Sequence, residues 1–150
     1  MYRYRHHKYK LYRYNLMSQY IIDNIKKILI DLHFSPIFNI ILNDEQIYNN
    51  GIDINKVNLK ILQEIPNDKN NILMDGIIVD NERFVVVSME QMESGILFIH
   101  FKSKEDGLLS IFGKKYIMTI KYDNEIVPMF YSVKIDNLKK KIPTINSLLK

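Results

Sequence analysis

The residues with the most evident chemistry lie in the first fourteen positions, where cations alternate with tyrosines. This segment holds five cations, two histidines and five tyrosines, and no acidic residue precedes Asp23. Arginine and lysine neutralise phosphates, and tyrosine offers a stacking face to an unpaired base. Such an arm suits single-stranded or irregular RNA. The pattern predicts a polyanion-binding arm, with a solvated terminal tail as the alternative.

The distribution of charge supports a division between this arm and the rest of the chain. The net charge is +4, residues 1–14 contribute +5, and residues 15–150 therefore sum to −1. A basic arm on a nearly neutral body is typical of polyanion binding. A second basic run, Lys139-Lys140-Lys141, offers a further phosphate contact or is a solvated end of an element. The predicted nucleic-acid-binding residues are Arg3, Arg5, Lys8, Tyr9, Lys10, Tyr12, Arg13, Lys139, Lys140 and Lys141.

Groups suited to catalysis or metal binding are sparse. The absence of cysteine excludes disulfides, thiolate metal sites and cysteine nucleophiles. The serines lie in no G-x-S-x-G motif, the glycines form no phosphate-binding loop, and the four histidines form no H-x-H or H-x-x-x-H pair. Asp75, Asp80 and Glu82 gather near one expected hairpin and are the candidates for a magnesium site. We expect no catalytic residue, no metal and no cofactor.

The clearest element behind the arm is an amphipathic helix over residues 16–34. Met17, Ile21, Ile25, Ile28 and Leu32 recur at three- and four-residue intervals, which is the helical period. Pro36 is expected to stop the helix, because proline lacks an N–H and disfavours helix at the preceding residue. The apolar stripe is expected to pack on a sheet, with partner binding as the alternative.

The rest of the chain favours strands. Strands are expected at residues 37–42, 57–61, 72–79, 83–88, 96–103, 108–112, 115–122 and 126–135. Asp80-Asn81-Glu82 and Asp123-Asn124-Glu125 are the expected turns of two hairpins, and Pro128 places the last strand at an edge or bulge. A short helix is expected after Pro143.

These elements predict an α+β fold with one domain at 15–150 behind an arm at 1–14. An N-terminal amphipathic helix would pack on a mainly antiparallel curled sheet or small β-barrel. No βαβ alternation is present, which argues against a doubly wound nucleotide fold. No apolar run approaches about 18 residues, so no membrane span is expected.

The function predicted from these features is RNA binding, in a non-enzymatic component of a ribonucleoprotein particle. The chain has 25 Ile, 17 Lys and 15 Asn but no Ala or Trp, which is typical of an AT-rich genome. We therefore predict a ribosomal protein of an organelle such as the mitochondrion, with RNA and neighbouring proteins as partners. The alternatives are a viral or accessory protein-interaction factor, whose arm binds nucleic acid or an acidic partner, and a small-barrel enzyme with its site near 75–82.

Overall fold

The computed structural model describes residues 2–54, 56–65, 75–123 and 128–150, and the side chains of residues 17–54, 59–65, 75–123 and 132–150. The helices are α1 (Tyr2–Asp31), α2 (Lys56–Glu64) and α4 (Pro128–Leu149), with a 3₁₀ turn, η1 (Glu93–Gly95). The strands are β1 (Phe38–Leu42), β2 (Glu45–Asn49), β3 (Ile77–Val79), β4 (Glu82–Gln91), β5 (Leu97–Lys102), β6 (Asp106–Phe112) and β7 (Tyr116–Asp123).

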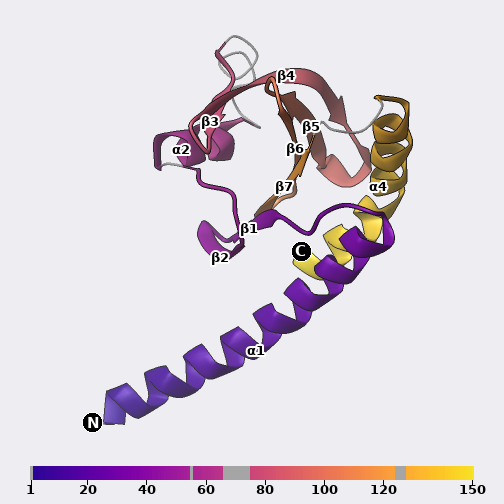
Figure 1. Ribbon diagram of the computed structural model, residues 1–150. Helices are drawn as coiled ribbons and strands as arrows, with labels where there is room; N and C mark the ends of the chain where they lie inside the picture. The colour runs from indigo at the N-terminus through magenta and orange to yellow at the C-terminus, as the bar shows by residue number, and fades with distance from the viewer. Residues whose placement is uncertain (1, 55, 66–74, 124–127) are drawn as a thin grey trace.

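In the described part of the chain, the strands form one curved antiparallel sheet in the order β2-β1-β7-β6-β5-β4-β3 (Figure 1). Two tight turns have both central residues in the left-handed region. They are Asn43-Asp44, with φ of 50° and 66°, and Asp80-Asn81, with φ of 52° and 62°. Turns of this type match the twist of hairpin strands, and Asn and Asp tolerate the conformation.

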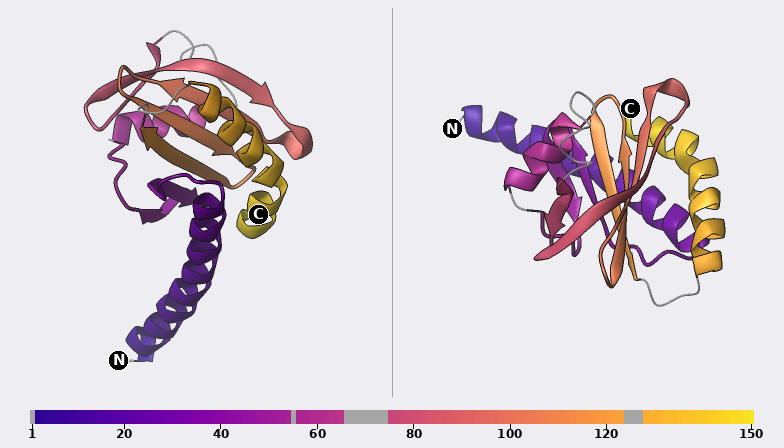
Figure 2. Two further views of the ribbon diagram at one scale, coloured as in Figure 1. Left: turned by 45° about the vertical axis from the view of Figure 1, so that its right-hand side comes forward. Right: turned by 90° about the horizontal axis from the view of Figure 1, so that it is seen from above.

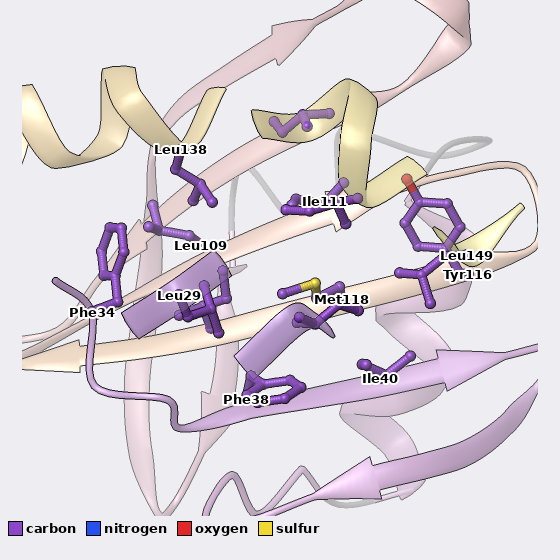
Figure 3. Packing of buried hydrophobic residues seen from close by; sticks show 14 of the residues in the cluster. Leu29, Phe34, Phe38, Ile40, Leu109, Ile111, Tyr116, Met118, Leu138 and Leu149 are labelled. Carbon is purple, nitrogen blue, oxygen red and sulfur yellow. The ribbon is translucent and has the colours of Figure 1, made fainter. Parts of the chain in front are cut away.

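One face of the sheet is covered by the two long helices, α1 and α4 (Figure 2). Ile25 and Leu29 of α1 and Leu138 of α4 are fully buried there. Figure 3 shows this cluster, in which the labelled residues are Leu29, Phe34, Phe38, Ile40, Leu109, Ile111, Tyr116, Met118, Leu138 and Leu149. The Lys134 ammonium also donates to the carbonyl of His33 at 2.7 Å, which ties α4 to the end of α1.

The opposite face packs on the short helix α2. Leu62 and Ile65 are fully buried against it, as is Phe84 of β4. Alternation along β5 supplies both faces, because Leu97, Ile99 and Phe101 point to this side while Phe98 joins the cluster under α1 and α4. The molecule therefore has three layers, with the sheet in the middle.

The predicted helix over 16–34 corresponds to α1, but the helix begins at Tyr2. The backbone of the predicted arm thus belongs to the helix, and the division between 1–14 and 15–150 stays a prediction. α1 ends before Pro36, because His33 adopts φ 64° and the Phe34 N–H donates to the carbonyl of Leu29 at 2.9 Å. The stripe packs on the sheet from Ile22 onward, as expected, while Met17 is 69% exposed.

Two predicted strands are helices. Residues 57–61 lie in α2, since the apolar residues continue as Leu62 and Ile65 at a helical interval that the short alternation concealed. Residues 128–135 open α4, where Pro128 is the first residue. Proline is favoured there because the first helical N–H has no partner within the helix. α4 also continues through Pro143 instead of starting after it.

The remaining predictions of strands are confirmed at β1, β4, β5, β6 and β7, and the sequence analysis missed β2. Of the described residues in the strand predicted over 72–79, only Ile77–Val79 form a strand, β3. Residues 66–74 and 124–127, which include the expected polar loop and part of the second hairpin, lie outside the described residues. The α+β class, with an N-terminal helix on a curled antiparallel sheet, is confirmed. No helix among the described residues is long and apolar enough to cross a membrane.

Candidate functional site

The carboxylates predicted near the first hairpin hold the fold together. Asp80 accepts a hydrogen bond from the Lys121 ammonium at 2.7 Å and another from the Asp53 N–H at 2.7 Å. Glu82 accepts from the Ser103 hydroxyl at 2.8 Å, and Asp75 is exposed. These contacts anchor the β3–β4 turn. Within the described part of the chain, no group of three potential ligands could hold a metal ion.

Lys121 is at the centre of this polar cluster. Burial alone would lower the pKa of its ammonium, but the hydrogen bond to Asp80 and the charges of Asp80, Asp106 and Glu82 raise the pKa above its ordinary value. Burial raises the pKa of Asp106, although the charge of Lys121 opposes this effect. The cluster is therefore an ion-pair network bound to its own turn, with its lysine held charged.

The predicted basic residues have different environments. Lys139 forms an ion pair with Glu90 at 2.8 Å and lies 5.6 Å from the centre of the Phe98 ring, so it links α4 to the sheet. Lys140 and Lys141 are exposed. The side chains of Arg3, Arg5, Lys8, Tyr9, Lys10, Tyr12 and Arg13 lie outside the described residues. Binding of an anionic partner by this set stays a prediction.

The described part of the chain does have an exposed apolar surface, on β3 and β4. Ile78 is 49% exposed, Val85 is 49% exposed and Val87 is 54% exposed. Ile78 pairs with Arg83, and β4 alternates so that Phe84 points into the core while Arg83 and Val85 point outward. We call Ile78, Arg83, Val85 and Val87 the outer strip.

The outer strip lies on the same face of the sheet as α1 and α4. The two helices leave this end of the face exposed. Val85 pairs with Lys102, and Lys102 lies on the same side of β5 as the buried Phe98 and His100, which is the side of α4. α4 runs alongside, because Lys139 reaches Glu90 while Asn146 accepts a hydrogen bond from the Tyr116 hydroxyl at 2.9 Å. β3 pairs with the start of β4, at 82–84, and its Val79 also forms a single bridge to Ile54.

α4 also carries an exposed apolar side chain, because Val133 is 57% exposed. An apolar strip beside a helix, bordered by Arg83, Lys102 and Glu90, has the chemistry of a protein-docking surface.

Comparisons with solved structures give the fold a family resemblance. The chain is similar to profilin II of Acanthamoeba castellanii, with a TM-score of 0.59 and 16% identity over 79% of this chain and 92% of that one. The fold is profilin-like. Profilin IA of the same organism gives a TM-score of 0.60 at 14% identity, covering 79% of this chain and 92% of that one. Profilin of Schizosaccharomyces pombe gives 0.60 at 14%, covering 80% and 94%.

At the level of sequence, neither protein-family models nor curated proteins match this chain. The resemblance to profilins is therefore one of fold, and it overturns the predicted function. The prediction of an RNA-binding, ribosomal or other ribonucleoprotein component is wrong, because the structural neighbours are profilins. RNA as the predicted partner is wrong for the same reason. The charge asymmetry led to the wrong function because it reports composition and not fold. The backbone of the basic segment is the first part of α1.

The sequence analysis also missed the outer strip, although a signal for it was present. Residues 84–87 read Phe-Val-Val-Val, so β4 is apolar on both of its faces. A strand that is covered on one side shows alternation between apolar and polar residues. A strand that is apolar on both faces needs packing partners on both faces. In β4, Phe84 is buried on one face, while Val85 and Val87 stay exposed.

Proposed function

We propose that this chain is a profilin-like protein-binding domain whose partner is actin. Profilins are actin-binding proteins, and the chain aligns with 92–94% of the length of three solved profilins. The observation that carries the proposal is this near-complete correspondence of fold.

The outer strip supports the proposal as the place of contact. Its apolar residues are half exposed on a rigid strand, and they are bordered by charges of both signs on Arg83, Lys102 and Glu90. Interfaces commonly combine an apolar centre with a polar rim. Because the strip is part of the sheet, binding needs little ordering of the chain, and less free energy is lost on association.

The test is direct binding to monomeric actin, measured by sedimentation velocity with fluorescently labelled actin. Val87→Glu places a charge on the outer strip and is expected to weaken binding by about tenfold or more, as at an interface hot spot. Ile30→Glu is the matched control, because Ile30 is 57% exposed on α1, outside the strip. It is expected to leave the affinity unchanged.

Two results would contradict the proposal. A wild-type chain that does not bind monomeric actin would rule out the proposed function. Equal affinities of the Val87→Glu and Ile30→Glu variants would leave actin as a partner but exclude the outer strip as its site. Thermal unfolding of each variant, followed by circular dichroism, confirms that a loss of binding does not come from a loss of fold.

A further inference from the structure

A second surface feature lies on the other side of the sheet. A cavity of about 660 Å³ opens where β1, β5, β6 and β7 meet near α2 and η1. It faces the α2 layer, and only Gln91, at the far end of β4, connects it to the strand that carries the outer strip. Small-molecule sites have volumes of about 300–1,000 Å³. The cavity is thus of suitable size and separate from the proposed actin contact.

The floor of the cavity is apolar. Ile41, Leu97, Phe112 and Ile117 line it, and each is at most 8% exposed. All four belong to the cluster on the α2 face of the sheet, so the packing of the domain fixes their positions. An apolar part of a ligand would gain from contact with this floor, at roughly 25 cal/mol for each Å² removed from water.

The rim is polar and carries an excess of positive charge. Asn43, Gln63, Gln91 and Ser94 supply neutral donors and acceptors, and Lys114 and Lys115 supply two ammonium groups. The one carboxylate of the lining, Asp44, accepts a hydrogen bond from the Gln63 amide at 3.3 Å. Two cations and one anion leave a net charge of +1, which matches a ligand with a single negative charge.

The lysines are carried by a turn that is fixed to the neighbouring chain segments. The Asn43 N–H donates to the Lys115 carbonyl at 2.8 Å, and the Gly113 N–H donates to the Tyr116 carbonyl at 2.9 Å. A Cβ at position 113 would lie 2.0 Å from the Tyr116 ring, so the turn packs directly on that ring. The cavity is therefore largely formed before any ligand arrives, as small-molecule sites usually are.

We propose that this cavity binds a small amphipathic carboxylate, with its apolar part on the floor and its carboxylate at Lys114 and Lys115. Lysine presents a compact point charge without the fork of arginine, which suits a monoanion that needs no bidentate partner. A free carboxylic acid and the C-terminus of a peptide share this chemistry. The neutral amides of the rim can donate hydrogen bonds to the carboxylate of a free acid or of a peptide C-terminus.

The experiment is a ¹H–¹⁵N NMR titration of the full chain with four probes. Decanoate and the peptide Ac-Gly-Gly-Leu-Phe-OH carry the carboxylate, while decanamide and the C-terminal amide of the same peptide lack it. Shifts are expected at Asn43, Gln91 and residues 113–117, and each acid should bind more tightly than its amide. Comparison of the affinities of decanoate and the peptide acid shows whether the site prefers a free carboxylic acid or a peptide C-terminus.

The double variant Lys114→Gln/Lys115→Gln tests the role of the charge. In water a pair of charges at about 4 Å is worth about 1 kcal/mol, or roughly fivefold in affinity for each lysine. The variant should therefore remove the preference for the acid and leave binding of the amide unchanged. Lys140→Gln/Lys141→Gln is the matched control, because both lysines are exposed on α4, far along the chain from the cavity. It should keep the full preference.

Three results would overturn the proposal: no binding of any probe to the wild-type chain, equal affinity of acid and amide, or shifts outside the cavity lining. A Gln91→Trp variant, which fills the mouth with a large side chain, should weaken binding of acid and amide alike. Unchanged binding in that variant would place the ligand elsewhere. Actin binding should be the same in all these variants, so the two proposals stand or fall separately.

Discussion

The buried histidine of β5 gives the protein a stability that depends on pH. His100 is 9% exposed, and its imidazole hydrogen-bonds to the Tyr122 hydroxyl. Burial, together with the positive charges of Lys102 and Lys139, lowers the pKa of His100 to about 4. In the unfolded chain a histidine has a pKa of about 6.5. The folded state thus favours the neutral ring over a range of pH in which the unfolded chain binds a proton.

The sign and size of the effect follow from this difference. Below pH 6.5 the unfolded state takes up a proton that the folded state refuses, so the free energy of unfolding falls as the pH falls. The loss reaches about 1.4 kcal/mol per pH unit and stops near pH 4, where the folded state is also protonated. Over the whole range the contribution is about 3 kcal/mol, which is a large share of the 5–15 kcal/mol typical of a domain.

Urea unfolding at several values of pH between 7.5 and 4.5, followed by circular dichroism, measures this slope. The control is His100→Gln, which keeps a hydrogen-bonding group opposite Tyr122 but does not titrate. Other groups that titrate in this range contribute equally to both proteins, so the difference between the two slopes isolates His100. Parallel slopes would refute the reasoning, and would mean that the ring takes up its proton in the folded state at an ordinary pKa.

Three further perturbations test the packing. Leu138→Ala, in the fully buried contact between α4 and the sheet, should lower the free energy of unfolding by about 2–5 kcal/mol in urea titrations, and a loss below 1 kcal/mol would contradict that contact. Gly76→Ala should destabilise the protein far more than Gly95→Ala, although both glycines have φ near +70°. A Cβ at position 76 would lie 2.1 Å from the Phe84 carbonyl oxygen, whereas a Cβ at position 95 would have no neighbouring atom within 4 Å. Equal melting temperatures would count against that close approach. Lys121→Gln should cost about 1–2 kcal/mol at pH 7, because Asp80 loses a charged partner at 2.7 Å. The cost should be smaller in an Asp80→Asn background, and an equal cost in both backgrounds would exclude the ion pair as its origin.

Local sequence signals were sufficient for most of the sheet. β5 was predictable because Leu97, Ile99 and Phe101 alternate with residues of the other face, and both faces are buried. The Asp80-Asn81 turn was predictable because both residue types tolerate a left-handed backbone. These signals arise within a few residues of chain, so no knowledge of the tertiary structure is needed to use them.

Signals that depend on distant contacts were misread. Residues 126–135 are rich in β-branched and aromatic side chains, yet the described part of that segment is helix because α4 buries Leu138, Ile142 and Ile145 at helical spacing. The same holds for α2, which depends on Leu62 and Ile65 reaching the sheet. Tertiary packing overrides local preference at such places. The cavity could not be foreseen, since its lining comes from seven separate elements.

The pairing of β1 with β7 has a consequence for the order in which the domain forms. Phe38 lies opposite Ile120, so the sheet joins an early segment of the chain directly to a late one. During synthesis, β1 and β2 leave the ribosome long before their partner exists, and α1 has no completed sheet to lie on. Topologies dominated by such distant pairings fold slowly. We therefore expect the nascent chain to carry the apolar faces of α1 and β1 uncovered until α4 has emerged, which makes this period the time of greatest need for a chaperone.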